Sequence, residues 1–313
     1  MLRLRLIAAC LSAMLLLGAC QSGPLKLVKR TEADKDAQEL LDSIDGPEVP
    51  SFERALLQSA EDAEREGNYV RVTQYYTQLL DKSPDNSRYR LGYADALRKS
   101  GQYPAAISQY DRLKDKAEFK PDALEGIALA QMAQGEFEQA GDNLSEVMEL
   151  DAARWQSINA IGILFTIRDM FPEAREYFAE ALVLKPQSVA IRNNMALMEA
   201  MAKNYDEAQR LLKEAQGLAS KRSPEQMQVD MNRALVYAIQ GEVKQAEEAA
   251  RPWLTEAQLL NNMGYYSHLA DNDQMAESYL NMALTKSPKH YQKAWTNLDS
   301  LKELMEQSPA KKR

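Results

Sequence analysis

The sequence predicts an all-α protein built as a solenoid of repeated helical pairs. Ala, Leu, Glu and Gln dominate the 313 residues and runs of Val, Ile and Thr are nearly absent, which favours helices over strands. Residues 169–186 predict a turn, an amphipathic helix and a stop, with Phe171, Ala174, Phe178 and Ala181 on one helical face. Versions of this stretch recur along the chain at a period of 34 residues, which indicates stacked repeats.

Five copies keep the same classes of residue at the same positions of the period. The second helix of each copy is centred on Val72, Ala106, Ala140, Ala174 or Ala208. An aromatic residue stands three positions earlier, at Tyr69, Tyr103, Phe137, Phe171 and Tyr205. Each first helix carries a small residue, at Ala60, Ala94, Ala128, Gly162 and Ala196. These features resemble the tetratricopeptide repeat, and the resemblance implies a right-handed superhelical solenoid with a continuous core.

The spacing changes in the last third of the chain and then recovers. The next equivalents are Ala246 and Ala276, which follow at intervals of 38 and 30 residues, so the register returns after two repeats. We expect the extra residues in the loop 217–226, where Ser223 begins the next helix. Pro252 should end the second helix of the sixth unit early.

About seven repeats are therefore predicted over residues 51–306. The last element, residues 290–306, predicts a C-terminal capping helix with an apolar inner face. That face is expected to carry Trp295, Leu298, Leu301 and Met305. Residues 307–313 predict a disordered tail.

The first 20 residues predict a bacterial lipoprotein signal. Two arginines precede an apolar run that is too short to span a bilayer comfortably, and the run ends in Leu17-Gly18-Ala19-Cys20. This ending resembles a lipobox, so we expect residues 1–19 to be removed and Cys20 to be acylated. Gln21 stands where lipoproteins retained at the inner membrane often carry Asp, which implies an outer-membrane lipoprotein facing the periplasm. An ordinary secretory signal or membrane anchor is the alternative.

Residues 20–50 predict an acylated N-terminus and a flexible tether. The segment is polar and acid-rich, and it contains Gly23-Pro24 and Gly46-Pro47. We expect the acyl chains, rather than protein charge, to attach the chain to the membrane. A segment that folds on contact with a partner is the alternative for the tether.

Composition and motifs predict a protein without cofactor, metal or nucleic acid. A formal net charge of −8 argues against binding nucleic acid through a general electrostatic field. Cys10 leaves with the signal and Cys20 carries lipid, so the mature chain has no thiol for a disulfide or a metal site. His268 and His290 lie outside any metal-ligand spacing, and no nucleophile-elbow, Walker or dinucleotide motif is present. We predict that the protein is not an enzyme; a solenoid hydrolase with convergent acids in a groove is the alternative.

The first helices predict a groove that binds a protein client. Exposed groove positions are expected at about the second, fifth, ninth and twelfth residue of each unit. With unit starts at Trp155, Val189 and Ala257, the fifth positions are Asn159, Asn193 and Asn261. Neighbouring groove residues are Gln156, Gln258, Tyr265 and His268, together with Thr166. Asn side chains both donate and accept, so they can hold the backbone of an extended segment.

A local role for the asparagines competes with client binding. Asn194, Asn232 and Asn262 occupy the sixth position of their units, where Asn in this repeat family often supports the adjacent helix. The Asn-Asn pairs are therefore expected to be partly structural.

A lipobox followed by this repeat array resembles the TadD lipoproteins of tight adherence (Flp pilus) secretion systems. The resemblance is carried by residues 190–212, 231–247 and 259–284, with an irregular sixth unit followed by an Asn-Asn opening. It implies a pilotin-like factor that helps a secretin insert, multimerise or stay stable, so the expected client is the secretin or another pilus-assembly component. A periplasmic adaptor for cell-envelope proteases or peptidoglycan enzymes is the alternative.

Overall fold

The computed structural model describes residues 51–287 and 291–307. Within these ranges the chain forms fifteen α-helices and one short 3-10 helix, with no strand. The predicted all-α class is therefore confirmed. The predicted signal sequence, Cys20, the tether and the residues after Gln307 lie outside the described residues.

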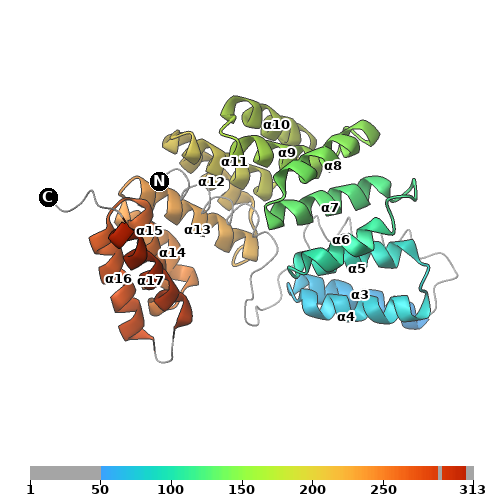
Figure 1. Cartoon of the computed structure of the whole chain (residues 1–313), viewed down its shortest axis with the longest axis horizontal. Coiled ribbons are helices and arrows are strands. Elements are labelled where there is room, and N and C mark those ends of the chain that lie inside the picture. The colour runs from blue at the N-terminus through green and yellow to red at the C-terminus, as the bar shows by residue number, and fades with distance from the viewer. Residues whose placement is uncertain (1–50, 288–290, 308–313) are drawn as a thin grey trace. The chain divides into compact units, whose positions relative to one another are not determined.

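The chain divides into two compact units, and the first contains the described residues 51–164. It holds three complete helical pairs and most of a further first helix, α9 (Trp155–Ile167) (Figure 1). The pairs are α3 (Ser51–Arg65) with α4 (Tyr69–Lys82), α5 (Ser87–Lys99) with α6 (Tyr103–Asp111), and α7 (Lys120–Gln134) with α8 (Phe137–Leu150). Each first helix packs against its own second helix, and α4 and α6 also pack against the next first helix.

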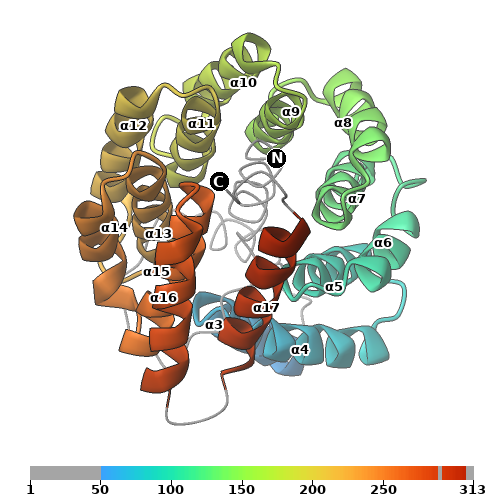
Figure 2. The same cartoon turned by 60° about the vertical axis from the view of Figure 1, so that its left-hand side comes forward.

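The second unit contains the described residues from Phe165 onward. Its helices are α10 (Phe171–Leu184), α11 (Val189–Met201), α12 (Tyr205–Leu218), α13 (Pro224–Ile239), α14 (Val243–Ala250), η1 (Arg251–Trp253), α15 (Glu256–Leu269), α16 (Asp273–Lys286) and α17 (Gln292–Gln307). Helix α17 packs against α16 and α15, and the three form the last group of the chain (Figure 2). Seven helical pairs and a final helix therefore follow one another, in the predicted order.

The turn inside each pair adopts a left-handed backbone. Gly67, Gly101, Gly135 and Gly241 have φ between 70° and 82°, and Asp169, Lys203 and Asp271 have φ between 57° and 65°. These turns share a hydrogen-bond pattern that closes a helix C-terminus, as when Asn204 N donates to Glu199 O at 2.8 Å. Such a closure requires φ > 0 at one residue, which explains why glycine recurs here in the sequence.

Helix α10 confirms the apolar face predicted for the repeating stretch. Ala174, Phe178 and Ala181 are fully buried, and α10 packs against α11. Pro172 stands in the first turn, where its missing N–H leaves no hydrogen bond unmade. The stripe is therefore a joint between neighbouring helices of the array.

The irregular sixth unit also follows the prediction. Ser223 caps α13 by accepting a hydrogen bond from Gln226 N at 3.1 Å. Helix α14 is only eight residues long, and Pro252 lies in the 3-10 turn η1 that follows it. The chain then restarts at α15, which Thr255 caps.

The inner face of the capping helix α17 differs in part from the prediction. Leu298 and Leu301 are buried, as expected, and Ala294 completes their stripe. Trp295 and Met305 are 42% and 40% exposed, so their predicted place on the inner face is wrong. Trp295 lies one residue, or about 100°, away from the stripe of Ala294, and Met305 belongs to the last turn of the helix.

Candidate partner-binding site

Asparagine side chains connect successive first helices of the second unit. Asn232 Nδ2 on α13 donates to Asn193 Oδ1 on α11 at 2.7 Å. Asn297 Nδ2 on α17 donates to Asn261 Oδ1 on α15 at 2.9 Å. These bonds occupy the acceptor oxygens of two predicted groove residues, which the alternative structural interpretation had assigned only to the sixth position.

The predicted fifth-position asparagines are more enclosed than expected. Asn159, Asn193 and Asn261 are 8%, 2% and 1% exposed. The physical reason at Asn193 and Asn261 is the interhelical bond, because a buried amide is costly unless it is hydrogen-bonded. Asn193 Nδ2 has no hydrogen-bond partner among the described residues. The role of these side chains in binding a partner stays a prediction.

The other predicted groove residues lie at the surface in different settings. Gln156 is exposed near the start of α9. Gln258 is also exposed but belongs to a capping box: its Oε1 accepts from Thr255 N at 3.0 Å, and Thr255 Oγ1 accepts from Gln258 N at 3.4 Å. The Thr-x-x-Gln spacing in the sequence is the signal for this local role.

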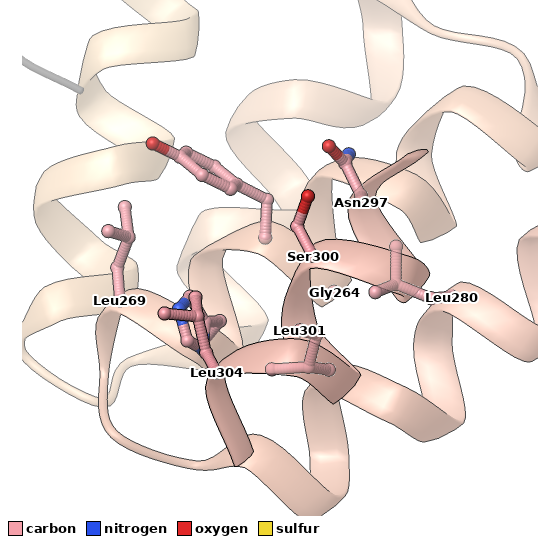
Figure 3. Close-up of a pocket in the computed structure, with 9 residues that line it drawn as sticks. Gly264, Leu269, Leu280, Asn297, Ser300, Leu301 and Leu304 are labelled. Carbon is pink, nitrogen blue, oxygen red and sulfur yellow. The ribbon is translucent and has the colours of Figure 1, made fainter. Parts of the chain in front are cut away.

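Tyr265 and His268 line one pocket between α15, α16 and α17 (Figure 3). Its volume is about 210 Å³. Its lining residues are Gly264, Tyr265, His268 and Leu269 from α15, Leu280 from α16, and Asn297, Ser300, Leu301 and Leu304 from α17. The pocket therefore joins two predicted groove residues to one side of the capping helix.

The floor of the pocket is apolar and well packed. Leu269, Leu280 and Leu301 are buried there. Gly264 allows α15 and α16 to approach closely, because a Cβ at this position would lie 2.7 Å from Leu280 Cγ and 3.1 Å from Ala276 O. A larger residue at 264 would force the two helices apart.

The rim carries polar groups whose orientation is set by neighbours. A 2.8 Å contact to Asp273 Oδ1 holds His268 Nδ1. Asn297 uses its Nδ2 on Asn261, so its Oδ1 is available as an acceptor. Asn297 and Ser300 present their polar atoms on the same side of the pocket (Figure 3). Tyr265 is 36% exposed.

Sequence reasoning missed the half of this site that α17 provides. Asn297, Ser300 and Leu304 follow each other at i, i+3 and i+7, so they share one side of a helix. That spacing was a usable signal, but it was overlooked because the helix was treated only as a cap with one inner face.

The buried carboxylates bear on the hydrolase alternative, and each is held by its neighbours. The bidentate contact of Glu199 with Arg175 joins Nε and Oε1 at 2.7 Å and NH2 and Oε2 at 2.9 Å. This hydrogen bonding raises the pKa of the Arg175 guanidinium. Glu125 contacts Arg154 and accepts from Ser157, and Asp230 accepts from Trp253 Nε1 at 2.9 Å. These three acids therefore serve as ties between elements.

Two further searches of the described residues returned nothing. No group of three or more His, Cys, Asp or Glu side chains there could hold a metal ion. No helix in the described ranges combines the length and the apolar character needed to cross a bilayer.

Comparison with known proteins identifies the repeat. Two models of the tetratricopeptide repeat match the sequence, one over residues 63–124 and the other over 96–154, 164–220 and 204–259. Together the matches cover more than half of the chain. None of the curated proteins matches the sequence.

Solved structures show the same fold at low sequence identity. A tetratricopeptide repeat protein from Parabacteroides merdae ATCC 43184 is 18% identical with a TM-score of 0.53, and the match covers 81% of this chain and 100% of that one. A chain of the APC/C hetero-tetramer Cut9–Hcn1 is 16% identical with a TM-score of 0.59, and the match covers 97% of this chain and 57% of that one.

Proposed function

The chain belongs to the tetratricopeptide repeat family, and from this premise we propose that it is a lipid-anchored scaffold that binds a protein client. Stacked repeats of this kind present extended surfaces to protein partners, and they typically perform no chemistry. The observation that carries the proposal is the pocket on α15 and α17, because it brings Tyr265 and His268 together in an open site.

The proposed membrane address rests on the sequence. The lipobox-like run Leu17-Gly18-Ala19-Cys20 supports acylation of Cys20, and Gln21 supports transport to the outer membrane. Several acyl chains on one cysteine hold a protein to a bilayer far more firmly than one chain does. The repeats would then face the periplasm at the end of the tether.

The proposed client is a component of a Flp-type pilus secretion system, with the secretin first. Support comes from the resemblance of residues 190–212, 231–247 and 259–284, behind a lipobox, to the TadD lipoproteins. The protein would bring a segment of the secretin to the outer membrane and so favour its insertion or stability.

Substitution of Cys20 tests the lipid address. Cys20→Ala should leave a folded protein with an unchanged circular dichroism spectrum, because Cys20 precedes the repeats. The variant should lose palmitate labelling, outer-membrane fractionation and assembled pili. Gln21→Asp is the matched variant: it should keep the label but move the protein to the inner membrane. Normal pilus assembly by Cys20→Ala would refute the lipid address.

Crosslinked pull-down from outer membranes tests the client. Recovery of a secretin or another pilus component with the wild-type chain is the expected result. Recovery of envelope proteases or peptidoglycan enzymes instead would overturn the pilus assignment and establish the adaptor alternative. Recovery of no protein at all would contradict the scaffold proposal itself.

A further inference from the structure

The pocket between α15, α16 and α17 has the chemistry of a site for one peptide side chain. We propose that it receives an uncharged apolar side chain, of the Leu, Met or Phe class, from an extended client segment with Lys or Arg beside that anchor. The inference deepens the scaffold proposal and rests on it.

Size selects a single side chain. Sites for drug-sized ligands and cofactors usually enclose roughly 300–1,000 Å³, whereas this pocket encloses about 210 Å³. Leu280 and Leu301 make the floor apolar, and no carboxylate or ammonium group lines the pocket. A charged group placed there would lose its hydration without gaining a partner.

The rim selects a side chain that is attached to a peptide backbone. Because Asn297 gives its Nδ2 to Asn261, its Oδ1 can accept from a peptide N–H. Ser300 is exposed, and its hydroxyl lies on the same side of the pocket as the Asn297 amide (Figure 3). A backbone passing over this edge would make hydrogen bonds while its side chain enters the pocket.

Charge around the site selects basic neighbours. Residues 256–287 and 291–307 contain seven acidic and three basic side chains. Asp299 and Glu303 are exposed beside the lining residues of α17, and Lys286 is paired with Glu256 at 3.1 Å. An acidic surround attracts cationic segments and repels anionic ones, so it adds specificity to an apolar anchor.

The end of the chain itself is a poor occupant. Residues 308–313 read Ser-Pro-Ala-Lys-Lys-Arg, which offers basic residues but no large apolar side chain. An external segment that combines both features fits the pocket better.

The test measures binding of a labelled probe peptide, acetyl-Gly-Leu-Lys-Lys-amide, by fluorescence anisotropy to the complete lipidated chain in detergent micelles. Replacement of Leu by Ser in the probe should weaken binding by roughly tenfold, the equivalent of about 1.4 kcal/mol of lost apolar burial. Replacement of both Lys by Glu should also weaken it, and added salt should reduce binding of the original peptide. Equal binding of the three peptides would overturn the proposal.

A filling variant on α17 and its matched control locate the site. Ser300→Phe should occupy the pocket and weaken the Leu peptide by roughly tenfold. Thr296→Phe adds the same ring to an exposed position of the same helix outside the lining, and should leave binding unchanged. If Ser300→Phe does not fold, methyl NMR of the wild type replaces it. Saturable shifts at Leu280 and Leu301 support the site, and their absence refutes it.

Two outcomes separate this inference from the scaffold proposal. If Ser300→Phe still recovers every client that the wild type recovers, the pocket inference fails and the scaffold proposal stands. If the wild type recovers no client, the scaffold proposal fails as well. Tighter peptide binding after truncation at Gln307 would identify residues 308–313 as the occupant and would also overturn the inference.

Discussion

Three turns in this chain place a residue with a side chain where glycine would be unstrained. Asp169, Lys203 and Asp271 adopt positive φ, while the equivalent turns elsewhere use glycine. A Cβ in the left-handed region crowds the following carbonyl at a cost of about 1–2 kcal/mol. These positions are therefore local weak points in an otherwise regular array.

Replacement of Lys203 should stabilise the protein. Lys203→Gly removes the left-handed strain but adds freedom to the unfolded chain worth about 0.4–1 kcal/mol. The net gain should be roughly 0.5–1 kcal/mol in the free energy of unfolding, measured by urea denaturation. Lys203→Ala is the matched control, because it removes the same long side chain and keeps the Cβ. Equal effects of the two substitutions would show that the side chain, not the backbone, sets the stability.

The asparagines show what residue types alone can and cannot reveal. Asn193 and Asn261 were correctly singled out as special positions, because an amide on a helix facing its neighbour has few neutral explanations. Sequence could not decide whether each amide faces a partner or the next helix. That choice depends on whether another Asn lies opposite, as Asn232 and Asn297 do in the folded chain.

At the scale of elements, helix α17 closes the apolar face of the last repeat. Leu298 and Leu301 pack with Leu280 and Ala276 of α16 in one buried cluster. The existence and length of this helix followed from its periodicity. Its rotation did not, because Trp295 and Met305 also fit an apolar period and only the shape of α15 and α16 distinguishes the alternatives. The polar side that contributes Asn297 and Ser300 to the pocket was missed for the same reason.

Truncation of Leu298 should loosen the end of the array. Leu298→Ala removes a side chain that is 2% exposed and should cost about 2–4 kcal/mol. Because repeats contact only their neighbours, the loss should appear first as faster hydrogen exchange in α15, α16 and α17. Met305→Ala on the same helix is the control and should change stability by less than about 0.5 kcal/mol. Similar exchange in both variants would contradict the assigned inner face.

At the scale of the whole molecule, buried phenols make stability sensitive to alkali. Burial raises the pKa of Tyr76, Tyr89, Tyr110 and Tyr266 above the ordinary value. Each folded phenol therefore holds its proton more tightly than the unfolded one. Its contribution to stability is complete below about pH 10 and is lost as the pH rises toward the folded pKa.

Urea unfolding between pH 8 and pH 11 should show this loss as a falling free energy of unfolding above about pH 10. Tyr110→Phe removes one of the phenols together with its 2.6 Å hydrogen bond to Asp95. The variant should be less stable by about 1–2 kcal/mol at pH 8 and should have a shallower alkaline slope. An unchanged slope would mean that Tyr110 does not contribute to the alkaline transition.

The repeat order was predictable because a 34-residue period repeats the same steric requirements many times. Small residues at helix crossings and glycines at left-handed turns each have a physical cause that a single sequence displays. The contacts between units were not predictable, because each is made by polar residues that occur only once at their position. The bidentate contact of Arg175 with Glu199 has no counterpart in the consensus pattern.

Those contacts differ from one joint to the next. Glu125 pairs with Arg154, Glu199 with Arg175, and Asp230 receives the Trp253 indole, while the apolar parts of the helices remain alike. A repeat placed beside the wrong neighbour would bury a carboxylate without its partner, at a cost of several kcal/mol. The units are therefore not interchangeable. Their polar joints act as keyed connectors that admit one assembly order, and they protect a modular chain from exchanging repeats with a second copy of itself.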